Sequence, residues 1–351
     1  MTGCKKENIA LINYHTYQEI KSQTKAWQNA LDVTSALAGP LKNLIKEYDQ
    51  VIFTGCGSTY YLSLAAAALF QSLTGKTARA VPGGDLFLNT STVMNDGSRY
   101  LLVAVSRSGT TTETLKAVEK FLDEKRGDVI VITNYDTALA KLGSLNIIIA
   151  EGQEKSVAQT RSFASMYVAV TALCAIAAGR DDLLEEMSSL PDSGLRIINQ
   201  YEGLAKELGE NLSFDRIYFL GSGIRYGLAS EVNLKMKEMT LTHSEPFHFL
   251  EFRHGPMSMA GETAIVVGLL SDKNFDHEQA VLNEMQAKGA RIFALSETRG
   301  DVVFASDIPE EVRGVLYLPV LQLLAFYRSL AKGLNPDRPK NLTAVVKLDF
   351  G

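Results

Sequence analysis

A group of hydroxyl side chains follows an apolar run in the segment VAVSRSGTTTETLKAVEKFL, residues 103–122. A helix that starts near Thr111 would point its free backbone N–H groups and the positive end of its dipole at this loop. Gly109 would let the backbone approach a ligand closely. Such a loop suits a phosphate monoester, because hydroxyls, amides and a guanidinium can all donate hydrogen bonds to its oxygens. The side-chain donors are Ser106, Arg107, Ser108, Thr110 and Thr111.

The same residues have a simpler interpretation as a helix cap. A Ser or Thr followed by Glu113 is a common pattern at helix starts. One hydroxyl group satisfies a cap, whereas this loop offers several. The surplus of hydroxyls therefore favours phosphate binding.

A glycine-containing turn, GCGST at residues 55–59, follows a short apolar run and precedes an alanine-rich helical pattern. It lacks the complete G-x-G-x-x-G pattern, since position 60 is Tyr60, and it lacks the lysine of a P-loop. The sequence therefore gives little support for a nicotinamide or ATP site. A tight strand-to-helix turn is the alternative interpretation.

A second group of reactive side chains lies in NLKMKEMTLTHSEPFHFLEFRHGPMSM, residues 233–259. Lys235 and Glu238 are three residues apart on a predicted helix and share one face. Taken separately, they could form an ordinary ion pair, and His254 could be a packed structural histidine. Beside a phosphate loop, a carboxylate that moves a proton between carbons and an imidazole that titrates near neutral pH favour sugar chemistry. The histidine spacing does not match a zinc motif, so no metal is expected.

One order of predicted elements occurs twice along the chain. Residues 50–70 and residues 215–238 both predict a strand, a Gly-x-Gly turn and a helix. The offset of about 165 residues is too long for a solenoid and suits two α/β domains. Because the apolar strands alternate with helices, parallel sheets covered on both faces are expected. Further strands are predicted at 100–109, 128–134, 264–273 and 290–297, and helices at 111–125 and 276–288.

Helical patterns at 12–47 and 180–211 precede the two predicted sheets, and the chain turns polar and acidic near residues 179–193. This change marks the predicted linker. The predicted organisation is an N-terminal helical segment at 1–48, domains at 49–180 and 181–335, and a tail at 336–351.

Two local patterns give further predictions. Pro246, Gly255 and Pro256 predict irregular chain rather than a strand in the histidine-rich segment. The apolar stretch at 162–179 contains hydroxyl side chains and is barely long enough to span a bilayer. It therefore predicts a buried core helix.

The composition is that of an ordinary globular protein. The chain has 351 residues, 46% of them hydrophobic and 21% charged, and a formal net charge of −5. No basic field would attract nucleic acid. Cys4, Cys56 and Cys174 form no disulfide or metal pattern, which fits a reducing cytoplasm. The N-terminal sequence lacks the apolar core of a secretory signal, so a cytoplasmic protein without membrane contact is expected.

The chain resembles the double sugar-isomerase (SIS) domain family, which includes the isomerase half of glucosamine-6-phosphate synthase. The spacing of sixteen residues between Glu238 and His254 fits this family. The matching segments extend from residue 50 to residue 343 and are GCGSTYY, SRSGTTTET, SVAQTRSF, NLKMKEMTLTHSEPFHFLEFRHGPMSM and NPDRPKNL. The resemblance implies two flavodoxin-like SIS domains, each a parallel sheet between helices in three αβα layers. It also implies a homodimer with the active site at the interface and no cofactor.

The resemblance assigns roles to single residues. Glu238 would carry the proton between C1 and C2, and Lys235 would lie beside it. His254 would reach in from the partner subunit and assist ring opening. The sugar phosphate would be held by Ser106, Arg107, Ser108 and Thr111, and the sugar would be lined by Ser58, Thr59, Val157 and Gln159.

Two departures from the family pattern limit what is expected. The chain begins Met-Thr-Gly-Cys and is too short for an added glutaminase domain with its N-terminal nucleophilic cysteine, so glutamine hydrolysis is not expected. The tail lysine of the synthase aligns with Ala344, whereas Lys340 and Lys347 are out of register. The sequence thus gives no support for a Schiff-base step by this tail.

The expected activity is isomerisation or deamination of an amino-hexose 6-phosphate, with proton transfer between C1 and C2. Stand-alone chains of this length resemble glucosamine-6-phosphate deaminases, tagatose-6-phosphate isomerase-like proteins and fructoselysine-6-phosphate deglycases. One alternative is therefore a fructosamine 6-phosphate deglycase. Another is a sugar-phosphate sensor without turnover, which the presence of both Glu238 and His254 disfavours.

Overall fold

The computed structural model describes residues 11–95 and 97–343. Their contacts form two compact units, and each unit is described by itself. The first unit contains residues 25–153, apart from residue 96, and residues 162–188; the second contains residues 11–24, 154–161 and 189–343. The predicted domain limits remain predictions, because this division follows contacts rather than chain order.

The first unit is built on a parallel five-stranded sheet with the order β2-β1-β3-β4-β5. This is the 2-1-3-4-5 order of flavodoxin-like folds, in which ligands bind beyond the carboxyl ends of the strands where the order reverses. Here that position lies between β1 and β3. The strands are β1 (Gln50–Gly55), β2 (Thr77–Pro82), β3 (Leu101–Ser106), β4 (Val129–Thr133) and β5 (Leu145–Ile148).

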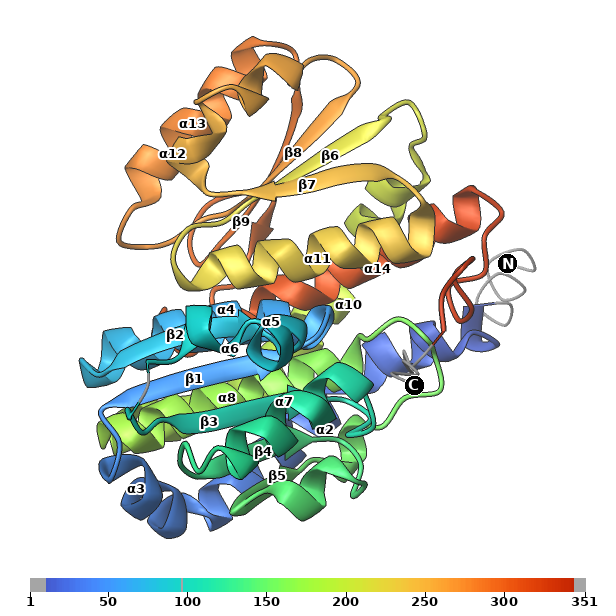
Figure 1. Ribbon diagram of the computed structural model, residues 1–351. Coiled ribbons are helices and arrows are strands. Elements are labelled where there is room, and N and C mark those ends of the chain that lie inside the picture. The colour runs from blue at the N-terminus through green and yellow to red at the C-terminus, as the bar shows by residue number, and fades with distance from the viewer. Residues whose placement is uncertain (1–10, 96, 344–351) are drawn as a thin grey trace. The chain divides into compact units, whose positions relative to one another are not determined.

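Helices flank this sheet, which gives the predicted α/β layers (Figure 1). The helices of the first unit are α3 (Ala38–Lys46), α4 (Ser58–Thr74), α5 (Gly83–Leu88), α6 (Thr90–Val93), α7 (Thr112–Asp123), α8 (Arg161–Ala178) and α9 (Asp181–Met187). Two short 3-10 turns, η1 (Leu139–Leu142) and η2 (Ala150–Gly152), lie near β5 in the chain.

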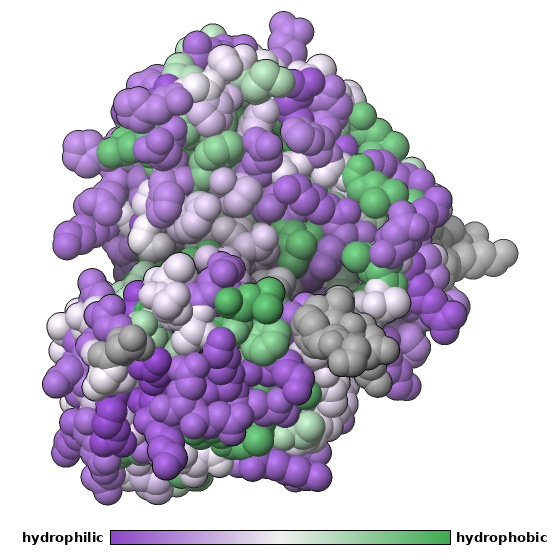
Figure 2. All heavy atoms as spheres, in the orientation of Figure 1, coloured by the Kyte–Doolittle hydropathy of each residue, from purple (hydrophilic) through white to green (hydrophobic). Residues whose placement is uncertain are grey.

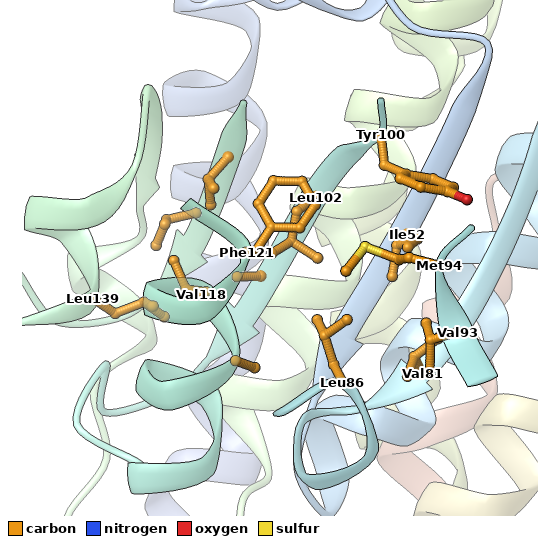
Figure 3. Packing of buried hydrophobic residues seen from close by; sticks show 14 residues of the cluster. Ile52, Val81, Leu86, Val93, Met94, Tyr100, Leu102, Val118, Phe121 and Leu139 are labelled. Atoms are coloured by element: carbon orange, nitrogen blue, oxygen red, sulfur yellow. The ribbon is translucent and has the colours of Figure 1, made fainter. Parts of the chain in front are cut away.

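One face of the first sheet packs against α5 and α7 (Figure 3). The strand register sets Ile52 beside Leu102 and Leu102 beside Val129, so an apolar row crosses three strands. Val118 and Phe121 are three residues apart on α7 and bury the apolar face of that helix in the same cluster. This packing holds the first turn of α7 at the carboxyl end of β3.

The second unit repeats the topology. Its parallel sheet has the order β10-β9-β8-β6-β7, which in chain order is again 2-1-3-4-5. The strands are β6 (Arg216–Leu220), β7 (His243–Phe247), β8 (Ala264–Leu269), β9 (Arg291–Ser296) and β10 (Val302–Val303). The helices and 3-10 turns are α10 (Leu190–Glu210), α11 (Ile224–Thr240), α12 (Phe249–Phe252), η3 (Pro256–Met259), α13 (Phe275–Ala287), η4 (Gly314–Tyr317) and α14 (Leu318–Ala331).

The two Gly-x-Gly turns have the same backbone. Gly57 has φ 57° and ψ −123°, and Gly223 has φ 58° and ψ −126°, a positive-φ conformation that favours glycine. A Cβ atom added to Gly55 or Gly221 would lie 2.5 or 2.4 Å from an atom of the residue four positions later. The predicted duplication is therefore confirmed down to the geometry of the turn.

Some element predictions were wrong. The segment around Pro246 was predicted to be irregular, but residues 243–247 form β7. Proline is tolerated there because, among the described strands, β7 lies at the sheet edge and pairs with β6 alone. The short strands β2, β5 and β10 were missed, since their exposed or partly exposed positions weaken the apolar signal.

The two long predicted helices are each divided by a break. The pattern at 12–47 is α2 (His15–Ala36) followed by α3, with Pro40 in the first turn of α3. The pattern at 180–211 is α9 followed by α10, which has Pro191 at its start. Proline fits a first helical turn, where its missing N–H would have no intrahelical partner.

Two helical windows are long and apolar enough to cross a membrane by composition, Arg161–Ala178 and Gly314–Ala331. Within the fold, 83% and 89% of these windows are buried. The predicted core helix at 162–179 is thus confirmed as α8. On the face drawn in Figure 2 the surface is largely hydrophilic, and apolar side chains occur in separate small groups.

Candidate active site

The hydroxyl-rich loop, residues 107–111, connects β3 to α7 at the position where the first sheet reverses its order. Ser106, the last residue of β3, and Arg107 are buried. Gly109 has φ +62°, and a Cβ atom there would lie 2.3 Å from Thr137 Oγ1. Only glycine therefore fits at the centre of this loop.

Hydrogen bonds inside the loop fix its shape. The Gly109 amide donates to Ser106 Oγ at 3.2 Å, and the Thr110 amide donates to Ser108 Oγ at 3.2 Å. Thr137 Oγ1 donates to the Ser108 carbonyl at 2.6 Å. Because Ser106 Oγ and Ser108 Oγ act as acceptors in these bonds, each hydroxyl keeps its own proton to donate to a ligand.

The structure argues against the simple cap interpretation. Thr111 is the N-cap residue of α7, yet its side chain makes no capping hydrogen bond within the described part of the chain. Glu113 lies at N2 rather than N3 and so cannot complete a capping box with Thr111, and its Oε2 is buried without a hydrogen-bond partner among the described residues. The Thr111 hydroxyl is therefore available for another role at the start of a twelve-residue helix.

Replacing Thr111 by valine separates these two interpretations. We expect the free energy of unfolding to change by less than about 0.5 kcal/mol, because no capping bond is lost. We expect KM for the sugar phosphate to rise about tenfold, because a hydrogen bond to the phosphate is lost. Urea denaturation and steady-state kinetics measure both quantities, with Thr77→Val as a matched control at an exposed threonine of the same unit. A loss of about 1 kcal/mol with an unchanged KM would identify the residue as an ordinary cap.

The first Gly-x-Gly turn lies beside this loop at the carboxyl end of β1. Ser58 and Thr59 are both buried in the first turn of α4. Thr59 Oγ1 accepts a hydrogen bond from the Cys56 amide at 2.9 Å and donates one to the Cys56 carbonyl at 3.0 Å. The Thr59 hydroxyl thus stabilises the turn, and its contact with a sugar stays a prediction. Burial raises the pKa of the Cys56 thiol, which disfavours a nucleophilic thiolate.

The predicted sugar-lining residues Val157 and Gln159 lie in the loop between η2 and α8, within the second unit. The Val157 amide donates to the Asp337 carbonyl at 3.1 Å, which joins this loop to the C-terminal tail. Gln159 Oε1 is buried and has no hydrogen-bond partner among the described residues. Such an atom costs free energy unless a ligand or water satisfies it, so it supports a ligand role for Gln159.

The tail is itself fastened to the start of α2. Asp337 accepts hydrogen bonds from the His15 amide at 3.0 Å, the Thr16 amide at 2.8 Å and Thr16 Oγ1 at 2.7 Å. Lys340 is exposed in this tail. Ala344, the position aligned with the family lysine, and Lys347 lie outside the described residues.

Lys235 and Glu238 meet as predicted, on one face of α11. Lys235 is only 1% exposed, and its Nζ atom lies 2.5 Å from Glu238 Oε2. Glu238 is more accessible, with 21% of its side chain exposed. The arrangement presents a carboxylate to solvent while a buried ammonium group supports its charge.

Glu231 is a third member of this group that the sequence analysis missed. Its Oε1 atom lies 3.5 Å from Lys235 Nζ, and both side chains are almost fully buried. The spacing of four residues on a predicted helix was the available signal. The buried ammonium group therefore lies between two carboxylates.

His254 lies on the exposed segment between α12 and η3. Among the described residues, no hydrogen bond or ion pair joins its imidazole to Glu238 or Lys235. The next residue, Gly255, has φ +129° and sets the direction of the chain at this point. Within residues 11–95 and 97–343, no group of three or more His, Cys, Asp or Glu side chains could hold a metal ion.

The SIS domain family matches residues 44–176 and 213–313, which include both Gly-x-Gly turns, the hydroxyl-rich loop and α11. The chain belongs to the SIS domain family. For this SIS protein, the predicted family and the predicted presence of two parallel sheets are therefore both confirmed.

Curated relatives of this SIS protein include longer chains named glutamine–fructose-6-phosphate aminotransferase [isomerizing]. The Sulfurisphaera tokodaii protein is 30% identical over 309 residues, which are 87% of this chain and 51% of the relative. The Pyrococcus horikoshii protein is 28% identical in an alignment 349 residues long that covers 95% of this chain and 57% of the relative. The chain thus spans about half the length of the curated relatives it matches.

Solved structures share the fold of this SIS protein over nearly its whole length. Glucosamine-6-phosphate deaminase from Thermotoga maritima has a TM-score of 0.77 and 24% identity, covering 95% of this chain and 100% of its own. Tagatose-6-phosphate ketose/aldose isomerase from Escherichia coli has a TM-score of 0.84 and 24% identity, covering 94% and 96%. At these identities the likeness concerns the fold alone.

Proposed function

We propose that this SIS protein is an aldose–ketose isomerase or deaminase that acts on an amino-hexose 6-phosphate. The observation that carries the proposal is the loop at residues 107–111, with its glycine at positive φ and a Thr111 hydroxyl that caps nothing. Relatives named as an aminotransferase, a deaminase and an isomerase of hexose 6-phosphates support the substrate class.

In the proposed reaction, the loop holds the substrate phosphate. Ser106, Ser108 and Thr111 donate hydroxyl hydrogen bonds, and Arg107 adds a positive charge. The first turn of α7 contributes backbone N–H groups and the positive end of its dipole. Fixing the phosphate positions C1 and C2 for proton transfer and reduces the entropic cost of the reaction.

Glu238 is the proposed proton carrier between C2 and C1, through an enolamine or enediol. The adjacent ammonium group of Lys235 donates a hydrogen bond to this carboxylate and holds it in place. When the substrate carries nitrogen, water then releases ammonia from the isomerised product. No step is assigned to the tail, since the family lysine position is Ala344.

We further propose that His254 acts from the partner subunit of a cytoplasmic homodimer and assists ring opening. Its exposed position and the lack of a side-chain hydrogen bond to its imidazole among the described residues support this role. The two ring nitrogens of an imidazole can donate and accept protons, so the group can pass a proton to a ring oxygen. Mixing the inactive variants Glu238→Gln and His254→Ala should restore activity only if two chains build each site.

The direct test is to incubate the purified protein with glucosamine 6-phosphate and assay ammonia and fructose 6-phosphate. Formation of both products identifies a deaminase, and formation of a ketose without ammonia from another hexose 6-phosphate identifies an isomerase. Release of a free amino acid from a fructosamine 6-phosphate would instead identify the deglycase. Saturable binding of all these compounds without any product would identify a sensor and contradict the proposal.

A further inference from the structure

The second unit has its own pocket at the place where its sheet reverses order. The pocket has a volume of about 280 Å³ and lies next to the second Gly-x-Gly turn, α12 and the first turn of α13. In flavodoxin-like sheets this edge is where ligands bind. The lining residues are Ser222, Phe249, Leu250, Asn274, His277 and Glu278.

The loop that precedes α13 corresponds to the hydroxyl-rich loop of the first unit. Each loop has five residues, 107–111 and 270–274, between the third strand of its sheet and the following helix. In the first unit, the Gly109 and Thr110 amides donate to serine hydroxyls. The second loop is different, because its backbone amides donate hydrogen bonds to carboxylates of the same chain.

Glu278 and Glu310 bind this second loop. The Ser271 amide donates to Glu278 Oε2 at 2.7 Å. The Asp272 and Lys273 amides donate to Glu310 Oε2 at 2.9 and 3.3 Å. Backbone N–H groups that could hold a phosphate are therefore already satisfied by built-in anions.

The charges around the second loop also disfavour a phosphate. Arg225 donates to Glu278 at 3.0 Å and to Glu310, and Arg313 pairs with Asp272 and Glu297. Two guanidinium groups thus face four carboxylates. The exposed Lys273 of the same loop adds a third cation, so the four ionised carboxylates exceed the cations by one. The local field is negative and attracts a neutral or cationic ligand rather than a phosphate dianion.

The pocket wall combines apolar and hydrogen-bonding groups. Leu250 forms the accessible apolar part, Phe249 lies fully buried behind the pocket surface, and Asn274 and His277 contribute an amide and an imidazole. Ser222 Oγ accepts a hydrogen bond from the Phe249 amide at 3.1 Å and keeps its proton for a ligand. A small pocket with a few convergent polar groups on an apolar wall suits a ligand of monosaccharide size.

We propose that the second unit carries a separate site for an unphosphorylated hexose or aminohexose, in the pocket between the second Gly-x-Gly turn and α13. A hydroxylated ring places its carbon face on the exposed Leu250 and its hydroxyls on the polar side chains. An ammonium group on the ligand adds attraction to the carboxylate excess. The inference does not rest on the proposed reaction, because its residues lie outside the hydroxyl-rich loop and exclude Glu238.

Isothermal titration of the full chain with glucosamine and with glucose tests the site. We expect saturable binding of both sugars, tighter for glucosamine, that glucosamine 6-phosphate does not displace. His277→Ala and Asn274→Ala should each weaken glucosamine binding about tenfold, because each removes a hydrogen-bonding group. Leu250→Trp should abolish it by filling the pocket. His243→Ala is the matched control, since this exposed imidazole lies in the same unit but outside the pocket.

Several results would overturn the inference. One is the absence of saturable binding at sugar concentrations up to tens of millimolar. Another is binding that glucosamine 6-phosphate displaces, or that Thr111→Val weakens, because the sugar would then occupy the site of the first loop. Binding that His277→Ala, Asn274→Ala and Leu250→Trp all leave unchanged would exclude the pocket as well.

Discussion

Replacing Glu238 by glutamine should lower kcat about a thousandfold, because the amide has nearly the shape of the carboxylate but cannot accept and return a proton. Exchange of substrate hydrogen with solvent deuterium should be lost together with product formation. Binding should persist, since the phosphate contacts assigned to residues 106–111 are untouched. Product assays, mass spectrometry and thermal shift with glucosamine 6-phosphate measure these three effects.

The matched control for this prediction is Glu207→Gln, which makes the same change at an exposed position of α10. It should leave turnover within about twofold of the wild-type value, as surface substitutions usually do. Undiminished turnover in Glu238→Gln would remove this carboxylate from the mechanism. Loss of turnover together with loss of sugar-phosphate binding would mean that Glu238 serves binding rather than proton transfer.

Replacing Lys235 by methionine should lower the free energy of unfolding by about 3 kcal/mol. The substitution leaves the carboxylates of Glu231 and Glu238 without the ammonium group that lies between them. Removing one partner of a buried ion pair is costly because an uncompensated charge stays behind. Urea denaturation monitored by circular dichroism gives the change, with Lys237→Met as the control at an exposed position of the same helix.

The double variant Glu231→Gln/Lys235→Met tests the cause of this loss. Removing the more buried carboxylate should recover a large part of the lost stability, because contacting residues behave non-additively. If the double variant loses at least as much stability as the two single variants together, the uncompensated carboxylate of Glu231 is not the source of the loss. A loss below about 0.5 kcal/mol in Lys235→Met itself would show that the ion pairs contribute little.

The sequence predicted features that depend on short-range patterns. The Gly-x-Gly turns, the apolar strands and the face shared by Lys235 and Glu238 all follow from local spacing, and each is present in the fold. The strand at Pro246 was missed for the opposite reason. Whether a proline can join a sheet depends on its position at an edge, and that position is set by strand order rather than by neighbours in the chain.

Contacts between segments far apart in the chain also could not be predicted from the sequence. Glu310 binds amides about forty residues earlier, and no spacing rule links them. The role of Thr59 in its own turn was not visible either, because a threonine in that position could equally contact a ligand. The loops at 107–111 and 270–274 therefore could be told apart only in the structure, by the groups that accept hydrogen bonds from their amides.

The contacts of Asp337 tie three separate parts of the chain together. Its side chain holds the first residues of α2, and its carbonyl holds Val157 in the predicted sugar loop. Fraying at the start of α2 would consequently be transmitted to the segment around Asp337 and to that loop. We infer that these three segments open and close as one cooperative unit, so amide exchange at Val157 should report on the order of the other two segments.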